Sequence, residues 1–518
     1  MPEGDATVTR EPSNRPESGE HERRLAINTI AQQASQVIVL VTALVAITVV
    51  ARRLSLPEFG TYGLLVSLTA YVSFVQGSIE AAAVKSVAEA ADQRARDEAF
   101  STALSLYVVA GVAAGAILAI GGTALLGVFN IPARLQHEAQ QSVVALGVVT
   151  CMGWPCKIFQ DILRGTQRFV DSASAEIGAS LAVGGLLIAL AISDAPLWLL
   201  VSAGGSLPLF IGIASALIVL WRKLPYRFRR SEVTWAAVRA FGRISSYLSL
   251  AGLSGLVIYS MDRAILAAFR SPTIVGLYEG PVRGHNLVQQ VHGTLTIPVL
   301  PAATAYLAEN DMERARELLL RGTRYILAAV IPVALVFMIL AQPILRVWLG
   351  PEFAAGATAM TLLVAYWLIN ANTGVAATML LAAGRVRWLA GYSAGVAAAN
   401  LFLSLALTPA FGLNGVVLGT TISYLVAFPF FVVKTLSTFP VRLAELAREA
   451  WLPAYVTGAV IGAVLVAVRV TVHFDSLVQV GGVGLLMIFL YWAIYYFAWL
   501  RPGERVLVKN VAAALVRR

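Results

Sequence analysis

The sequence has little charge and almost no cysteine. Only 13% of its 518 residues are Asp, Glu, Lys or Arg, whereas 58% are hydrophobic, and it contains two cysteines. This share of charged residues is far below the share found in soluble domains. Cys151 and Cys156 lie five positions apart in one expected helix, which points them about 140° apart and prevents an unstrained disulfide. We interpret both as packing residues.

The chain also lacks the motifs of common nucleotide-driven and hydrolytic enzymes. It has no Walker A pattern, no HExxH, no CxxC and no GxSxG. These absences remove the usual support for ATP-driven export and for hydrolysis. The longest expected connection, 222–244, is rich in arginine and too short for a catalytic domain. The sequence therefore predicts a carrier rather than an enzyme.

Long apolar segments make up most of the chain. About fourteen of them have about 20 residues or more, enough to cross a hydrocarbon layer of about 30 Å. We place them at 25–50, 60–84, 101–126, 139–163, 173–193, 196–221, 245–268, 276–306, 324–348, 357–381, 388–408, 413–437, 452–472 and 478–500. The sequence predicts an all-α, polytopic membrane protein with about 14 transmembrane helices.

Basic residues gather in every second connection. They cluster at 85–96, 164–168, 222–243, 314–324, 385–387, 434–448 and 501–518. Because Lys and Arg are retained on the cytoplasmic side, both termini are expected in the cytoplasm, at a plasma or inner cell membrane. The net charge of +10 then faces anionic lipid, and no nucleic acid is expected as a partner. Residues 1–24 are polar and predict a disordered cytoplasmic tail without a cleavable signal.

Two short segments six spans apart resemble each other. Residues 53–62 and residues 270–278 both contain Arg, Ser and Pro followed by Gly-x-Tyr. Six spans is an even number, so the two halves would have parallel topology about a pseudo-twofold axis along the membrane normal. Two unrelated loops are the alternative.

These segments and several later ones carry a family resemblance. They are Ala51–Tyr62, Met261–Leu266, Val275–Tyr278, Pro298–Pro301, Trp348–Phe353, Leu381–Arg385 and Pro409–Val416. In this order and spacing, over roughly residues 25–440, the chain resembles the O-antigen and polysaccharide flippases (oligosaccharide flippases) of the multidrug/oligosaccharidyl-lipid/polysaccharide superfamily.

The resemblance implies two six-helix lobes around a central cavity, with two additional C-terminal helices. The lobes would be 25–221, with transmembrane helices 1–6, and 245–437, with helices 7–12. The basic linker 222–244 would join them, and helices 13–14 with a cytoplasmic C-terminus would occupy 438–518. The implied substrate is a polyprenyl-diphosphate-linked oligosaccharide moved to the outer leaflet by alternating access. No cofactor is implied; a Na⁺ or H⁺ gradient or the membrane potential would drive transport. The expected partners are this substrate and membrane lipid, with a polysaccharide polymerase or assembly proteins as further candidates.

Polar residues inside the spans are candidates for lining the cavity, because charges in the bilayer usually face protein or water. Arginines would attract the diphosphate, and amide side chains would replace the hydration of the sugars. The substrate-binding candidates are Arg283, Arg263, Arg164, Asn28, Gln32, Gln76, Gln290, Asn370 and Asn400. The ion-coupling candidates are Asp262, Glu279 and Glu80.

Each of these patterns has an alternative interpretation. Arg283 could form a neutralised pair with Glu279 or with Asp262 that simply joins two helices. Asn28 and Gln32, with Ser35, could be interhelical glue. A multidrug exporter of the same superfamily is the second functional candidate, and it predicts an excess of buried carboxylates. A membrane-embedded glycosyltransferase or polymerase is the third.

Overall fold

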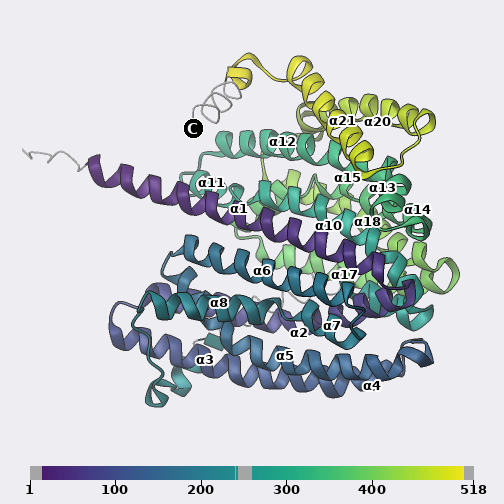
Figure 1. The fold of residues 1–518 in the computed structure, drawn as a ribbon. Coiled ribbons are helices and arrows are strands. Elements are labelled where there is room, and N and C mark those ends of the chain that lie inside the picture. The colour runs from purple at the N-terminus through teal and green to yellow at the C-terminus, as the bar shows by residue number, and fades with distance from the viewer. Residues whose placement is uncertain (1–14, 240, 243–259, 507–518) are drawn as a thin grey trace, which may run out of the picture.

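The computed structural model of the chain describes residues 15–239, 241–242 and 260–506. Every regular element in these residues is a helix, as Figure 1 shows. Eleven of the helices are long and apolar enough to cross a membrane, and a twelfth candidate is a bent pair. The predicted all-α, polytopic class is confirmed.

The helices of the first half are α1 (Arg15–Arg53), α2 (Leu56–Glu89), α3 (Gln93–Ala116), η1 (Ile117–Gly121), α4 (Gly122–Leu126), α5 (Ala133–Gly165), α6 (Phe169–Ile192), α7 (Leu197–Gly205), α8 (Leu207–Trp221) and η2 (Arg230–Glu232). Those of the second half are α10 (Pro272–Thr296), α11 (Val299–Ala308), α12 (Met312–Ile339), α13 (Ala341–Trp348), η3 (Pro351–Gly356), α14 (Ala357–Ala365), α15 (Trp367–Asn370), α16 (Gly374–Ala382), α17 (Val386–Phe411) and α18 (Leu413–Thr438). The chain continues with α19 (Leu443–Leu446), η4 (Ala447–Trp451), α20 (Leu452–Thr471) and α21 (Leu477–Ala498).

The predicted count of 14 transmembrane helices stays untested, because two of the expected spans do not each correspond to one described helix. Most of the span expected at 245–268 lies outside the described residues, although residues 260–269 are helical. The span expected at 276–306 corresponds to α10 and α11, which are separated at Ile297 and Pro298. Pro298 has no N–H to continue the hydrogen bonding of α10, which accounts for the break.

The polar N-terminal segment differs from the prediction. Residues 1–14 lie outside the described residues, but α1 already begins at Arg15, so the part of the expected tail from residue 15 to residue 24 is helical. Pro16 stands in the first turn, where its missing N–H costs nothing, and the following Glu and Arg residues are good helix formers. The prediction of a disordered segment was therefore wrong for residues 15–24, because it rested on low hydrophobicity alone.

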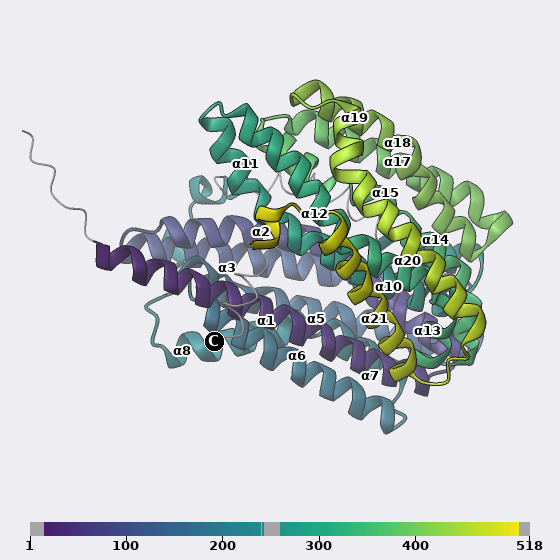
Figure 2. The same cartoon turned by 90° about the horizontal axis from the view of Figure 1, so that it is seen from above.

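The helices form two groups that lie one over the other in Figure 1. Helices α1–α8 contact one another, as do α10–α18, while α20 and α21 pack on α12 and cover it in Figure 2. The first and last described residues lie at the same end of the molecule (Figure 1). We call this the near end and the opposite one the far end.

Apolar side chains cover much of the outer surface. Val478 is 84% exposed and Phe497 is 73% exposed, both on α21. In water so large an apolar surface would be unfavourable, whereas in a bilayer it faces lipid. By contrast, α12 is the most buried of the candidate spans found in the described residues, with 56% of its apolar window inside the protein. This helix is central to the second group.

Candidate functional site

The main contact between the two helix groups is the crossing of α2 with α10. A Cβ added at Gly60 would overlap the Pro272 carbonyl oxygen and lie 2.7 Å from the Gly276 amide nitrogen. A Cβ added at Gly276 would lie 2.6 Å from the Leu56 carbonyl oxygen. Only glycine allows the two backbones to approach this closely. The two Gly-x-Tyr motifs of the sequence repeat therefore meet in the structure.

This contact is reciprocal. Gly60 faces Pro272, and Gly276 faces Leu56. Adding 216 to a residue number of the first motif gives its equivalent in the second, so Gly60 corresponds to Gly276 and Leu56 corresponds to Pro272. Each glycine therefore faces the residue equivalent to the one that the other glycine faces. Reciprocal contacts of equivalent residues are what a twofold axis produces. The observation favours the repeat over the alternative of two unrelated loops.

Further contacts join the two groups at the same far end. Arg52 Nη2 donates to the Val347 carbonyl oxygen at 2.7 Å. Asn130 Nδ2 donates to the Ala268 carbonyl oxygen at 2.9 Å. The rings of Phe59 and Phe353 meet edge to face with centroids 5.7 Å apart. We call these contacts, together with the Gly60–Gly276 crossing, the far-end gate, and all of them are formed in this structure.

Beside the far-end gate, two arginines share one carboxylate. Arg263 Nε donates to Glu279 Oε1 at 2.5 Å, and Arg283 Nη2 lies 3.2 Å from Glu279 Oε2. The Glu279 side chain is 2% exposed, whereas those of Arg263 and Arg283 are 16% and 24% exposed. A Cβ added at Gly63 on α2 would lie 2.5 Å from Glu279 Oε1, so the carboxylate presses against α2. We call these three charged residues the arginine triad.

The structure selects between the two predicted pairings of Arg283. The pair with Glu279 forms, whereas no ion pair joins Arg283 to Asp262 in the described part of the chain. Instead, Asp262 Oδ2 accepts a hydrogen bond from the Tyr278 hydroxyl at 2.6 Å. Asp262 Oδ1 and Arg283 Nε are buried with no partner among the described residues. The site therefore keeps unused hydrogen-bonding capacity next to the triad.

A second charged cluster lies nearer the other end of α2. Lys157 Nζ on α5 lies 2.9 Å from Glu80 Oε2 and 3.1 Å from Asp161 Oδ1. Arg164, also on α5, pairs with Glu80 and with Glu176 Oε1 at 2.9 Å. We call these five residues the near-end cluster; it holds three carboxylates and two cations. Glu80 follows Gly63 by 17 positions on α2, so the cluster lies roughly 25 Å from the triad.

Among the described residues, Gln32 and Ser35 of α1 contact this cluster through Glu176 on α6. Ser35 Oγ donates to Glu176 Oε2 at 3.0 Å, and Gln32 Nε2 lies 3.4 Å from the same oxygen. Asn28 is half-buried on α1. These bonds join α1 to α6, which fits the alternative of interhelical glue for Gln32.

The remaining predicted amides lie apart from one another. Asn400 is 2% exposed, and its Nδ2 donates to Thr420 Oγ1 at 2.8 Å, joining α17 to α18. Asn370 Oδ1 accepts from Thr373 Oγ1 at 3.1 Å. Gln76 is buried on α2 with no partner among the described residues for its Nε2, and Gln290 is half-buried on α10. The structure does not gather these amides into one group.

Lys157 and Glu176 were missed by the sequence reasoning. Each is a charged residue inside an expected span, and Lys157 precedes Asp161 by one helical turn. That position inside the membrane was a sufficient signal for both. Among the described residues, no group of three or more His, Cys, Asp or Glu side chains could hold a metal ion.

Comparison with known proteins identifies relatives of the chain. A sequence profile described as polysaccharide biosynthesis protein matches residues 49–357. The uncharacterized membrane protein EpsK of Bacillus subtilis (strain 168) is 21% identical over 332 residues, which cover 62% of this chain and 64% of EpsK. The match thus spans less than two thirds of that relative.

Solved structures share the fold. The lipid II flippase MurJ in an inward closed conformation superposes with a TM-score of 0.68 at 12% identity, covering 92% of this chain and 100% of MurJ. An inward-facing multidrug resistance MATE family transporter of the MOP superfamily superposes with a TM-score of 0.63 at 14% identity, covering 79% of this chain and 98% of the transporter. At 12% and 14% identity, these likenesses show that the chain shares the fold of both proteins. Since the profile matches more than half of its length, the chain belongs to the polysaccharide biosynthesis protein family.

Proposed function

We propose that this protein is a flippase that moves a polyprenyl-diphosphate-linked oligosaccharide from the cytoplasmic to the outer leaflet by alternating access. The observation that carries the proposal is the arginine triad, in which two arginines beside a gate share a single carboxylate. The triad has a net charge of +1, although Asp262 next to it brings the local sum to zero when ionised. A guanidinium fork binds two phosphate oxygens at once, so Arg263 and Arg283 can exchange Glu279 for a diphosphate.

The cargo explains why such a protein is needed. A sugar hydroxyl moved into hydrocarbon without a partner costs on the order of 4–8 kcal/mol, so an oligosaccharide cannot cross unaided. The polyprenyl tail can stay in lipid throughout. The half-buried amides Asn28, Gln32 and Gln290 are proposed to replace water around the sugars, and Gln76 offers its unpartnered Nε2. Asn370 and Asn400 are proposed to act in the second group, after giving up their present partners.

The proposed orientation of the protein in the membrane rests on the distribution of basic residues. The near end carries the Arg-rich connections and is assigned to the cytoplasm of a plasma or inner membrane. The far-end gate would then face outward, and cargo would enter from the near end. Opening of the gate would release the triad and its cargo to the other side.

Two driving forces fit this arrangement. An inside-negative potential favours outward movement of negative charge by about 2.3 kcal/mol per charge per 100 mV. Exchange of Na⁺ or H⁺ at Asp262, Glu279 or Glu80 is the second. Asp262 is the better candidate of the three, because one of its oxygens is buried without a partner among the described residues.

The experiment that tests the proposal measures flipping in proteoliposomes. Purified Arg283→Gln should lose at least tenfold in the initial rate at which a polyprenyl-diphosphate oligosaccharide in the inner leaflet becomes accessible outside. The matched control is Arg314→Gln, which removes an arginine that is 62% exposed at the near end. Full activity of Arg283→Gln, with the protein folded and inserted, would remove the triad from the mechanism.

The second candidate function is export of organic cations. The near-end cluster favours it, because three carboxylates there face two cations. Uptake of a fluorescent organic cation into the same proteoliposomes separates the two functions. A flippase gives no uptake above empty vesicles, whereas an exporter accumulates the cation and loses this activity on Glu80→Gln.

A further inference from the structure

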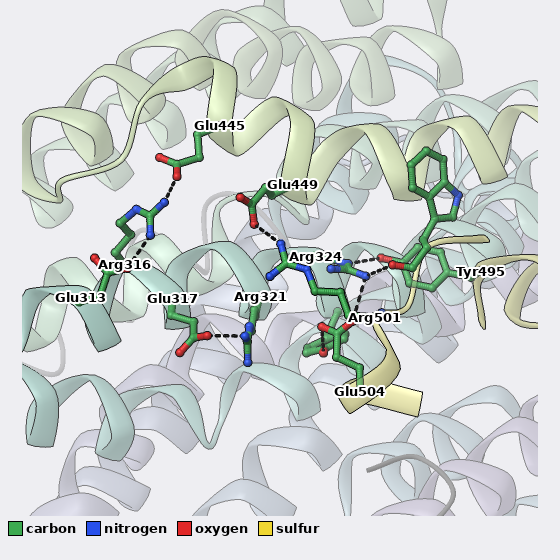
Figure 3. Close-up of polar contacts among 12 residues, drawn as sticks. Glu313, Arg316, Glu317, Arg321, Arg324, Glu445, Glu449, Tyr495, Arg501 and Glu504 are labelled. Carbon is green, nitrogen blue, oxygen red and sulfur yellow. Dashed lines mark hydrogen bonds and ion pairs between the residues drawn. The ribbon is translucent and has the colours of Figure 1, made fainter. Parts of the chain in front are cut away.

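A cavity of about 800 Å³ opens at the near end of α12, beside the C-terminal helices. Its walls come from α12, from α19 and η4, and from the chain just after α21. Figure 3 shows arginine and glutamate side chains from these elements pointing toward one another. Neither α2 nor α10 contributes to the walls, so the cavity is separate from the triad and the near-end cluster.

The cavity is basic. The arginines that line it are Arg316, Arg324, Arg442, Arg448 and Arg501, and the carboxylates are Glu445 and Glu449. Five cations against two anions leave a net charge of +3 on the walls, and Glu313 and Glu504, which pair with Arg316 and Arg324 from outside the walls, lower the local sum to +1. Positive charge in a concave site concentrates anions from the surroundings.

Both lining carboxylates are already occupied. Glu445 pairs with Arg316, and Glu449 Oε2 lies 3.1 Å from Arg501 Nη2 (Figure 3). Arg324 is held by the Tyr495 hydroxyl at 3.1 Å and by the carbonyl oxygen of Trp499 at 2.6 Å. The fixed arginines therefore form a built wall rather than a loose surface patch.

Arg442 and Arg448 have no such partner. Both are exposed, and neither side chain makes an ion pair or hydrogen bond within the described part of the chain. They lie in the segment 442–451, which contains α19 and η4 and leads directly into α20; we call it the α19–η4 elbow. Two unpaired guanidinium groups opposite a fixed basic wall leave the site short of an anion.

We propose that this cavity binds the phosphate headgroup of an anionic glycerophospholipid of the leaflet at the near end. Its position explains why the ligand is a lipid. Trp499 follows the last residue of α21, and Pro453 stands in the first turn of α20, so the cavity lies where two spans reach the membrane surface. Tryptophan at this depth is typical of the lipid–water interface. A headgroup bound there would hold the α19–η4 elbow against α12 and the end of α21.

Binding of short-chain lipids to the full-length protein in a neutral detergent tests the proposal. The probes are dihexanoyl phosphatidylglycerol, dihexanoyl phosphatidylcholine and inorganic phosphate, each titrated while the thermal midpoint is followed. Phosphatidylglycerol should raise the midpoint, and the other two should raise it much less. Arg442→Gln/Arg448→Gln should weaken phosphatidylglycerol binding by roughly fivefold for each arginine, or about 25-fold together.

The matched control is Arg385→Gln/Arg387→Gln. It removes the same charge from two exposed arginines of another near-end connection, and these do not line the cavity. This control should bind phosphatidylglycerol as the native chain does. An equal loss in both double variants would show a diffuse surface charge and overturn the site. Equal effects of phosphatidylcholine would overturn the need for an anion. A full effect of inorganic phosphate would overturn the assignment to a lipid.

Discussion

Replacing Gly60 by alanine should open the far-end gate. The new Cβ would lie 2.6 Å from the Pro272 carbonyl carbon and 2.7 Å from the Gly276 amide nitrogen. These neighbours are backbone atoms of α10, which cannot rotate away, so α2 and α10 must separate. Overpacking of this kind costs about 1–3 kcal/mol. Because the strain exists only while the gate is closed, it shifts the population toward the open state by about 5- to 150-fold.

Distances between spin labels across the gate measure this shift. Labels at Val128 and Glu352, in a chain whose two cysteines are replaced by serine, report the separation of the two groups at the far end. The native protein should give one short distance, and Gly60→Ala should add a longer one. Gly276→Ala should act in the same direction, because its Cβ would lie 2.6 Å from the Leu56 carbonyl oxygen.

Gly77→Ala provides the control on the same helix. A Cβ there meets nothing within 4 Å. Both substitutions gain the same helix propensity, about 1 kcal/mol, in the open and the closed state alike. Gly77→Ala should therefore keep the native distance. An unchanged distance distribution in folded Gly60→Ala would refute the assignment of this crossing as a moving contact.

Two further predictions concern buried charges. Lys157→Met should lower stability in detergent by about 3–5 kcal/mol, because it leaves the fully buried carboxylate of Asp161 without its cation. Lys85→Met, at an exposed pair, should change stability by under about 1 kcal/mol; equal unfolding midpoints would contradict this. After α21, Glu504 loses hydration by burial, but hydrogen bonds from Tyr325 and the Arg501 backbone, with the Arg324 charge, hold its pKa below the ordinary 4.5. A depressed pKa stabilises the fold above pH 4.5 and loses this effect as the pH falls through the folded value. The midpoints of the native chain and Glu504→Gln should therefore differ at pH 7, and the gap should shrink as the pH falls below 4.5. A gap that stays constant down to the lowest pH at which both proteins remain folded would argue against the ionised carboxylate.

The sequence by itself determined the class of the protein and much of its topology. Runs such as 324–348 and 413–437 must be helices in lipid, because no water is present there to satisfy exposed backbone groups. The clusters of basic residues between the spans predicted that both ends of the chain share one side, and the first and last described residues do lie at one end (Figure 1). The charged candidates for the functional site could also be predicted, since Arg263, Glu279 and Arg283 lie within expected membrane spans.

Only the tertiary structure decided which of these residues meet. Helical periodicity relates Glu279 to Arg283 one turn away, but it cannot show that Arg263 is the second partner and that Asp262 turns to Tyr278 instead. The Gly60–Gly276 contact joins residues 216 positions apart, and a one-dimensional pattern carries no information on the angle at which two helices cross. The basic cavity depends likewise on α12 meeting the α19–η4 elbow. Hydrophobicity fixes which segments enter the membrane, because transfer from water acts on each segment separately, whereas pairings arise only when side chains from several helices compete for the same partners.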